Sequence, residues 1–511
     1  MEYPPVFQAW PRLVLSGILI IFLAISSCTR SDQELPKILQ VGMEPTFAPF
    51  EFQPGGGEVI GFDVDLMRAV GAAAGLEVEF KTMNFDGLIP ALAVGQIQAA
   101  TSGITITADR LKVVDFSRPY FEATLAIGVL PANRNLKTFK DLEGKRIAVQ
   151  IGTASADEAK KIPNANVIIY DSTDLSIQSL ISKNVDAIIN DTPTLLYSIA
   201  RGGFSQIQVF RQEETRQYYG VATQQQSPYL KLINQGLDKI LKDGTYDKIY
   251  TQWFKAPAPA LPALAPAQQE RVSTQSGLWD SLKTSLRAVP ALLQGTVITL
   301  QLTTASIVLG IAGGLVLALV RLSQNKWGLG LSAIYIDFFR GTPLLVQIFM
   351  IYFGIPGVVQ GLGLDFSPNR FVASVAALSL NEAAYMAEIL RSGLQAVEKG
   401  QQEAAESLGF SGWQTLRHVV FPQAFRQMVP ALGNEFISML KNTSLVAVIG
   451  YEELFRKGQL IVADEYRPFE IYTTVAIIYL IMTVIAARGF DYLEYRLYPD
   501  KQPHKIITSV K

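Results

Sequence analysis

The feature that most constrains this chain is a series of apolar stretches in its C-terminal half. They run at about 295–320, 336–355, 371–391, 424–450 and 470–489. Stretches of about 20 apolar residues match the hydrocarbon core of a bilayer, so each is predicted to be a membrane-spanning helix. The second and fourth are less purely apolar than the others. The sequence therefore predicts that this half folds as an all-α membrane domain with five spans.

Residues 38–255 have a different pattern, in which strand-like and helix-like stretches alternate. "ILQVGM" and "RIAVQI" are typical of strands, and "VDLMRAVGAAAG" and "LIPALAVGQ" of amphipathic helices. An α/β domain is expected here. The Pro/Ala-rich segment 256–270 is predicted to be a semi-rigid spacer. Residues 275–293 look amphipathic and are predicted to lie on the membrane face. The membrane domain would then fill 294–500, with a cytoplasmic tail at 501–511.

The first 28 residues have the pattern of a secretory signal. Arg12 precedes an apolar stretch, and small residues lead up to Cys28, the only cysteine of the chain. The end of this segment resembles a bacterial lipobox, in which the cysteine is lipidated and becomes the new N-terminus. The alternative is an uncleaved anchor with an incidental thiol. Either way a polar tether, 29–37, leads to a domain outside the cytoplasm.

Charge supports this placement and argues against one class of partner. The net charge is −1, with 44 basic and 45 acidic residues, so nucleic acid is not expected to bind. The basic residues of the predicted connections divide unevenly between the two sides of the membrane. The richer side has Arg321, Lys326, Arg391, Lys399, Arg417, Arg488, Arg496, Lys501, Lys505 and Lys511, and the poorer side has Arg370, Arg456, Lys457 and Arg467. The side with more basic residues is predicted to be the cytoplasmic one. The membrane is predicted to be the bacterial inner membrane.

Two segments of the α/β domain carry candidate ligand groups. "SGITITADRLKVVDFSRPYF" places Thr105 and Arg110 close together after a likely strand, and a guanidinium suits a carboxylate. "DAIINDTPTLLY" places Asp191 at a strand-to-helix turn, where it could hold an ammonium group or simply cap the helix. Together an arginine and an aspartate fit an α-amino acid, although surface arginines and capping aspartates are common.

From Ile38 to Phe254 the chain resembles the periplasmic glutamine-binding protein and its polar amino-acid-binding relatives. The resemblance rests on "EPTFAPFEF", "GFDVDLMRAV", "MNFDGLIPAL", "SGITITADR", "VDFSRPYF", "VQIGTAS", "NDTPTLLY" and "GTYDKIYTQWF". It implies the two-lobed type II periplasmic-binding-protein fold, hinged by two strands and closing over one amino acid. The binding positions it implies are Phe47 and Phe85 around the side chain, Gly103, Thr105, Arg110 and the backbone at Thr153 and Ala154 for the carboxylate, and Asp191 for the ammonium.

The chain departs from the glutamine binder at the side-chain end of this site. Where that protein has an aspartate, a lysine and a histidine, this one has Glu44, Gln150 and Asn190. An unpaired buried carboxylate is costly, so Glu44 favours a cationic side chain. Arginine, lysine or histidine are therefore expected ligands, and glutamine remains an alternative.

Residues 400–422 form a polar stretch between the third and fourth predicted spans. "EAAESLG" is typical of a helix that ends at Gly409, and Ser411 with Gln414 has the spacing of a capping box, so a second helix is predicted to run to Pro422. A plain solvated loop is the alternative. The stretch resembles the EAA motif of ABC importer permeases, carried here by Glu403, Ala404, Ala405, Gly409, Val419, Phe421 and Pro422. In that family it is the coupling helix that contacts the ATPase.

The flanking stretches extend this resemblance to the polar amino-acid ABC permeases, from Gly295 to the C-terminal region. They include "FRGTPLLVQIFMIYFG", "LNEAAYMAEILRSG" and "FPQAFRQMVPALGNEFISMLKNTSLVAVIG". There is no G-x-x-x-x-G-K-[ST] motif, so this chain is predicted not to be an enzyme and to hold no cofactor or metal. Two ATPase subunits, carrying ATP and Mg, are expected as partners, and a homodimer is expected through the permease domain. The alternative function is an amino-acid-gated ion channel.

Ionisable residues inside the predicted spans are candidates for the transport path. They are Glu382, Glu388, Glu435 and Lys441. Such groups usually face protein or water rather than lipid. The favoured explanation is an ion pair between helices or between subunits. The functional hypothesis is that Glu382 or Glu435 lines the path of a cationic substrate.

Overall fold

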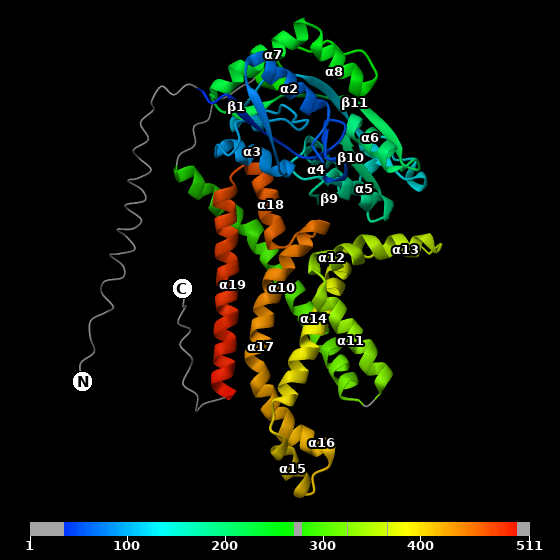
Figure 1. The fold of residues 1–511 in the computed structure, drawn as a ribbon, viewed down its shortest axis with the longest axis vertical. Helices are drawn as coiled ribbons and strands as arrows, with labels where there is room; N and C mark the ends of the chain where they lie inside the picture. Colours follow the sequence, from blue (N-terminus) through cyan, green and yellow to red (C-terminus); the bar gives the residue numbers. More distant parts are fainter. Residues whose placement is uncertain (1–34, 270–277, 324, 365, 498–511) are drawn as a thin grey trace, which may run out of the picture.

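The computed structural model describes residues 35–269, 278–323, 325–364 and 366–497. Cys28, the signal segment, residues 29–34 of the predicted tether and the tail 501–511 lie outside these ranges, so their predictions stay untested. Figure 1 shows an α/β domain at one end of a bundle of long helices. The short helices α15 (Lys399–Ser407) and α16 (Gly412–Thr415) lie at the opposite end of the bundle from this domain.

The first lobe of the α/β domain is built on a five-stranded sheet in the order β4-β1-β5-β12-β6. Its strands are β4 (Glu77–Thr82), β1 (Ile38–Met43), β5 (Ala99–Ala100), β12 (Ala222–Gln224) and β6 (Val114–Phe116). A ribbon of β2 (Thr46–Phe47) and β3 (Glu51–Phe52) adjoins it. The helices are α2 (Phe62–Ala74), α3 (Phe85–Ala93), α7 (Pro228–Lys242) and α8 (Thr245–Phe254). Buried apolar side chains of α2, α7 and α8 pack together in this lobe's core.

The second lobe has a sheet in the order β11-β7-β10-β8-β9. Its strands are β11 (Gln208–Tyr219), β7 (Phe121–Val129), β10 (Ala187–Asp191), β8 (Arg146–Gln150) and β9 (Asn166–Tyr170), and its helices are α4 (Ala154–Lys160), α5 (Thr173–Ile181) and α6 (Thr192–Gly202). Tyr219 lies opposite Phe121 where β11 and β7 leave this sheet. The chain crosses to β6 and β12 of the first lobe there, so two lobes hinged by two strands are confirmed.

The helical domain consists of long helices with several breaks. They are α10 (Leu278–Leu322), α11 (Lys326–Gly341), α12 (Leu344–Phe349), α13 (Ile355–Gly361), α14 (Arg370–Gln395), α15 (Lys399–Ser407), α16 (Gly412–Thr415), α17 (Phe421–Asn442), α18 (Leu454–Glu465) and α19 (Pro468–Leu497). Close packing of α10 on α14 depends on small residues. A Cβ at Gly310 or Gly314 would lie 2.5 Å from a side-chain carbon of α14.

Segment 275–293 is not a separate surface helix. From Leu278 it forms the first part of the 45-residue α10, which continues into the first predicted span. Pro290 lies inside this helix without ending it. Amphipathic periodicity alone could not locate a helix boundary here, because no capping signal separates the two parts.

The second predicted span, 336–355, is not one straight helix. α11 and the helix that begins at Leu344 are bent by 107° at Gly341, Thr342 and Pro343. Thr342 is extended, with φ −116° and ψ 146°, as expected for a residue that precedes proline. By length and hydropathy alone, two described helices could cross a membrane, or three if the bent pair is one span. The count of five spans is therefore not confirmed.

The polar stretch 400–422 forms a helical elbow, as predicted. α15 is followed by Gly409 with φ +84°, and the capping box of Ser411 and Gln414 starts α16. The predicted stop at Pro422 is wrong, because a π-helical turn, Leu416–Val420, joins α16 to α17. Pro422 lies in the first turn of α17, where its missing N–H is tolerated.

The Pro/Ala segment 256–270 also differs from a free spacer. Ala265 is buried against the first lobe, and the Gln268 side chain donates to the backbone oxygens of Phe116 (3.2 Å) and Ser117 (3.0 Å). The end of the segment forms a short helix, α9 (Pro266–Gln269). Proline-rich composition predicts stiffness, but it does not exclude packing on a neighbouring surface.

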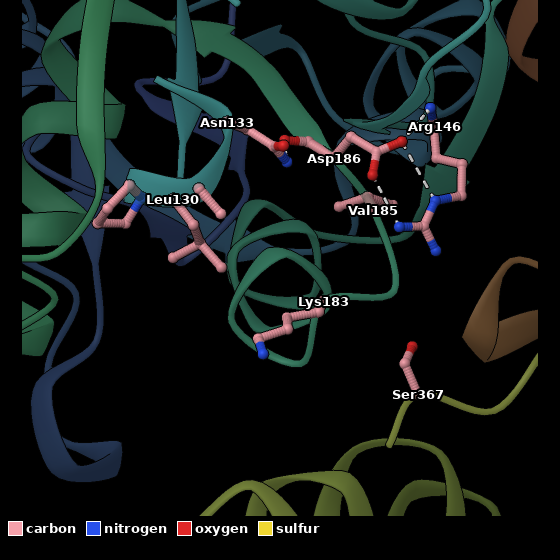
Figure 2. A pocket seen from close by; sticks show the side chains of 9 residues that line it. Leu130, Asn133, Arg146, Lys183, Val185, Asp186 and Ser367 are labelled. Atoms are coloured by element: carbon pink, nitrogen blue, oxygen red, sulfur yellow. Dashed lines mark hydrogen bonds and ion pairs between the residues drawn. The ribbon is translucent and has the colours of Figure 1, made fainter. Parts of the chain in front are cut away.

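The second lobe rests directly on the helical domain. Tyr170 of β9 and Tyr352 of the helical domain are hydrogen-bonded through their hydroxyl groups at 3.1 Å. Their apolar neighbours belong to one continuous cluster. Beside this contact Ser367, in the loop before α14, donates to Asn184 at 2.5 Å and faces a pocket of about 510 Å³ lined by Arg146 and Asp186 (Figure 2).

Candidate functional site

The predicted ligand residues gather where the two lobes meet. Most of them follow the carboxyl ends of strands, the usual position of ligand sites in α/β sheets. Six come from the first lobe and three from the second, and all nine are buried: Glu44, Phe47, Phe85, Gly103, Thr105, Arg110, Gln150, Thr153 and Asp191. The structure therefore brings these nine positions together.

Glu44 follows β1 and marks one end of the site. Its carboxylate accepts hydrogen bonds from Thr46 (3.0 Å) and, across the lobe boundary, from Gln150 (2.7 Å). Burial raises the pKa of Glu44 from its ordinary value of 4.5 to about 7, and the hydrogen bond from Gln150 opposes this shift. No cation contacts this carboxylate among the described residues, so its charge is available to a ligand.

Phe47 and Gly103 form one wall of the site. Gly103 has φ +54°, and a Cβ there would lie 2.4 Å from the Phe47 ring. The glycine is thus needed both for its backbone conformation and for the close approach of the ring. The Gly103 N–H donates to Asp63 at 3.1 Å, so in this conformation it is not free for a carboxylate.

Arg110 lies at the opposite end from Glu44 and is only 2% exposed. Its guanidinium donates to the backbone oxygens of Thr105 (2.6 Å) and Gly152 (2.8 Å). The Phe85 ring lies 5.5 Å from the guanidinium carbon. Gly152 belongs to the second lobe, so Arg110 bridges the cleft. These two bonds use two of the five N–H donors of a guanidinium, so the other donors can bind a carboxylate.

Gln150 and Thr153 bring the second lobe to the site. The Gln150 carbonyl accepts from Thr173 (2.9 Å), which fixes its amide toward Glu44. The Thr153 hydroxyl accepts from the Ala156 N–H (3.2 Å) and donates to the Gln150 backbone oxygen (2.7 Å). The Thr153 side chain is therefore occupied by capping α4.

Asp191 ends β10 and does not cap the helix that follows it. Its side chain makes no capping hydrogen bond to α6. Instead it accepts from the Gln217 amide, and burial raises its pKa from 3.8 to about 7. The alternative of a simple helix cap is thus excluded by the geometry. The carboxylate faces the site, with Arg110 as the nearby positive charge.

The sequence did not identify a buried pair of carboxyl groups behind this wall. Glu51 and Asp63 are both 0% exposed, and the charge of Asp63 acts on Glu51. Asp63 accepts from Thr101 (2.8 Å), Tyr120 (2.7 Å) and the Gly103 N–H, and Ser102 donates to Glu51. Burial and the neighbouring Asp63 raise the pKa of Glu51 well above its ordinary value. The only sequence signal for Glu51 was its place in the "EF" that ends "EPTFAPFEF".

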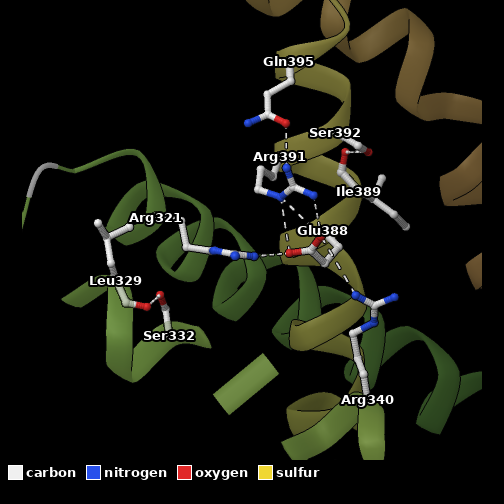
Figure 3. Close-up of polar contacts among 9 residues, drawn as sticks. All are labelled: Arg321, Leu329, Ser332, Arg340, Glu388, Ile389, Arg391, Ser392 and Gln395. Carbon is white, nitrogen blue, oxygen red and sulfur yellow. Dashed lines mark hydrogen bonds and ion pairs between the residues drawn. The ribbon is translucent and has the colours of Figure 1, made fainter. Parts of the chain in front are cut away.

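In the helical domain Glu388 is held by arginines. It pairs with Arg321 of α10, with Arg391 at 2.8 Å, and lies 4.0 Å from Arg340 of α11 (Figure 3). Glu388 therefore belongs to a structural ion-pair network, which was the alternative to a place on the transport path. The network joins the C-terminal part of α10 to α14.

Glu382 is in a different environment. It is 2% exposed on α14, packs against Gly310 of α10, and its Oε1 has no hydrogen-bond partner among the described residues. The charge of Glu435 on α17 acts on it. No ion pair to either residue is found in the described part of the chain, but the charge of Arg340 acts on Glu435, so the structural alternative lacks support only for Glu382.

Comparisons with known proteins agree with this geometry. Residues 39–256 match the family of bacterial extracellular solute-binding proteins, family 3, and residues 310–498 match the binding-protein-dependent transport system inner membrane component. The glutamine transport system permease protein GlnP of Escherichia coli (strain K12) is 40% identical over 214 residues, which is 41% of this chain and 94% of that protein. The chain belongs to the binding-protein-dependent transport family.

One further relative and one solved structure are similar to parts of this chain. The octopine transport system permease protein OccM of Rhizobium radiobacter is 42% identical over 223 residues, 43% of this chain and 91% of that protein. A solved ancestral arginine-binding protein bound to arginine is 40% identical, covers 43% of this chain and all of that chain, and has a TM-score of 0.42. Because the two family matches lie in one polypeptide, a binding domain and a permease domain are fused in this transport-family chain.

Proposed function

We propose that the chain is the combined substrate-binding and permease subunit of an ATP-driven importer of polar amino acids. The observation that carries the proposal is the buried cleft with Arg110 at one end and the unpaired carboxylates of Asp191 and Glu44 facing it. Arg110 would bind the α-carboxylate and Asp191 the α-ammonium group. Phe47 and Phe85 would enclose the side chain.

Glu44 makes a cationic side chain the best match. A buried carboxylate with a raised pKa is relieved by a positive ligand, and Gln150 supplies no charge to neutralise it. We therefore propose arginine, lysine or histidine as substrates. Glutamine is the second candidate, because Gln150 and Glu44 can also hydrogen-bond an amide, and because a relative is named for glutamine transport.

The exposed elbow between α15 and α16 would contact the ATPase. Leu408 (79% exposed) and Trp413 (68% exposed) flank Gly409 there, which is unusual for a surface in water and typical of a protein contact. Glu403 and Ala404 are exposed beside them, Ala405 is buried, and Pro422 begins α17. ATP and Mg would be held by two partner subunits.

Each chain has one permease domain, so a symmetric transporter needs a second copy of the chain. We propose a homodimer through the permease domain. Each chain would cross the bacterial inner membrane five times, and the bent α11–α12 pair would be its second span. Cys28 would be lipidated on the outer side. Glu382 and Glu435 would line the path of the cationic substrate. ATP-driven closure of the partner subunits would be transmitted through residues 400–422 and open this path outward, and hydrolysis would return it to face inward.

The ion-channel alternative is disfavoured by chain order. In the glutamate-receptor type the pore is inserted between the lobes, whereas here both lobes are complete before α10 begins. The test is uptake: the chain, reconstituted with its ATPase in vesicles, should accumulate labelled L-arginine only with ATP. Accumulation that is independent of ATP would contradict the proposal.

A further inference from the structure

The segment that joins the two domains runs along the first lobe and ends at the hinge between the lobes. Residues 256–269 are called the linker from here on. Ala258 and Leu261 of the linker pack against a core cluster of the first lobe, and Ala265 is 1% exposed in a second one. The match to the solute-binding family ends at residue 256, so the linker is an addition to that domain. Residues 270–277 separate it from α10.

Gln268 makes the last contact of the linker. Its amide nitrogen donates to the backbone oxygens of Phe116 (3.2 Å) and Ser117 (3.0 Å). Its carbonyl oxygen accepts from the Ala265 N–H at 2.8 Å. Because Ala265 is itself buried against the lobe, the Gln268 amide is fixed at both ends and held facing the two backbone oxygens.

These two oxygens belong to the start of the hinge. Phe116 is the last residue of β6, and Ser117 is the first residue of the crossing to β7. Val221 lies in the return crossing, between β11 and β12. The Ser117 N–H donates to the Val221 oxygen at 2.9 Å, and the Val221 N–H donates to the Ser117 hydroxyl at 2.9 Å. Gln268 therefore binds the hinge where its two strands are joined.

A side chain that binds two successive carbonyl groups restrains the backbone between them. Peptide planes are rigid, so the relative direction of the Phe116 and Ser117 carbonyls depends on φ and ψ of Ser117. The lobes are closed in this structure, because Arg110 of the first lobe bonds to Gly152 of the second. Gln268 consequently holds the torsions of Ser117 at the values that they have in the closed form.

We propose that Gln268 of the linker braces the hinge in its closed setting and thereby slows release of the bound ligand. The inference rests on the proposed function, since it assumes an amino-acid ligand. By thermodynamic linkage, a contact that favours the closed form also favours the ligand that needs this form. Gln268 acts as a positioning residue and does not touch the ligand. Withdrawal of the linker from the hinge would speed ligand release.

The test measures dissociation of L-arginine and, separately, of L-glutamine from the full chain in lipid nanodiscs by stopped flow. Gln268→Glu keeps the shape of the side chain but has no N–H to donate, so dissociation of both ligands should become about 3- to 10-fold faster. Ala265→Asp places a carboxylate in a buried position and should displace the linker with the same result, without altering Gln268. Because both changes release one brace, the double variant should dissociate no faster than the faster single variant.

Leu264→Ala is the matched control, because Leu264 precedes Ala265 in the linker but is 51% exposed, so an unchanged dissociation rate is expected. An unchanged rate in Gln268→Glu, or equal acceleration by Leu264→Ala, would overturn the inference. A merely structural role of Gln268 would lower the number of binding sites per chain and leave the rate of the remaining sites unchanged, which would also overturn it. A wild-type chain that binds neither ligand would instead overturn the proposed function, so the two failures are distinguishable.

Discussion

The Gln150 amide of the second lobe donates a 2.7 Å hydrogen bond to the Glu44 carboxylate of the first lobe. This bond closes the side-chain end of the cleft without neutralising the charge of Glu44. The identity of residue 150 should therefore decide how much of that charge a ligand experiences.

Replacing Gln150 with lysine is expected to change ligand preference. The lysine ammonium would pair with Glu44 and compete with a cationic ligand. The affinity for L-arginine should fall about 10- to 100-fold, and the affinity for L-glutamine should fall less. Calorimetry with both ligands measures the ratio. An unchanged ratio would show that Glu44 does not contact the ligand side chain.

Ligand binding should depend on pH through Glu44. Its pKa is about 7 in the ligand-free closed domain, and a cationic ligand needs the ionised form. Below pH 7 binding must displace a proton, so the affinity for L-arginine should rise with pH by up to about tenfold per unit until about pH 7. Asp191 affects both ligands alike, so the arginine-to-glutamine ratio between pH 5.5 and 8 isolates Glu44. A flat ratio would contradict the assignment.

The same shift has the opposite effect on the stability of the ligand-free domain. The folded pKa of Glu44, about 7, lies above its ordinary value of 4.5, so between these values the folded state binds more protons than the unfolded state. Its contribution is fully present below pH 4.5 and is lost as the pH rises through 7. Glu44→Gln should remove this part of the pH dependence of thermal unfolding.

Of the buried residues Glu51 and Asp63, only Glu51 should be replaceable by its amide without a large loss of stability. Burial and the charge of Asp63 raise the pKa of Glu51, so the uncharged Glu51→Gln should change the free energy of unfolding by about 1 kcal/mol or less. Asp63 accepts several hydrogen bonds, so Asp63→Asn should lose about 2–3 kcal/mol and disturb Gly103. Denaturant unfolding compares the two, and equal losses would show that neither carboxyl has a preferred protonation state.

The elbow at Gly409 should couple the permease to its ATPase. Gly409→Asp is expected to abolish uptake and to leave ligand affinity unchanged. Gly363→Asp is the matched control: Gly363 also has positive φ (+80°), and a Cβ at either glycine meets nothing within 4 Å. Gly363 lies before α14, on the side of the binding domain. If both variants transport equally, the coupling role of residues 400–422 is wrong.

Glu382→Gln should slow transport of L-arginine about tenfold or more and affect L-glutamine less. The buried carboxylate lacks an ion-pair partner among the described residues, so the change removes a charge that only a cationic substrate would use. Initial uptake rates with saturating ligand measure the effect. Full transport of both substrates would remove Glu382 from the path.

The sequence predicted the binding site more completely than the helical domain. Short motifs after strands singled out Arg110 and Asp191, and the resemblance to the glutamine binder added Glu44. Their hydrogen-bond partners, such as Gln217, lie far away in the chain and have no local signal.

Tertiary contacts decided the features that the sequence missed. Arg456 was counted only as an outer loop charge, and its burial depends on how two domains pack. Pro422 resembled a helix stop, but a π-helical turn before it lets the helix continue. Hydropathy did not reveal the 107° bend after Gly341, although Pro343 predicts an extended residue before it.

The most direct test of the central claim is calorimetry of the full chain in nanodiscs against each of the twenty amino acids. The account predicts saturable binding of one or more polar amino acids, tightest for a cationic side chain, and loss of this binding in Arg110→Ala and in Asp191→Asn. Absence of binding to any of the twenty, or binding that survives both substitutions, would contradict it.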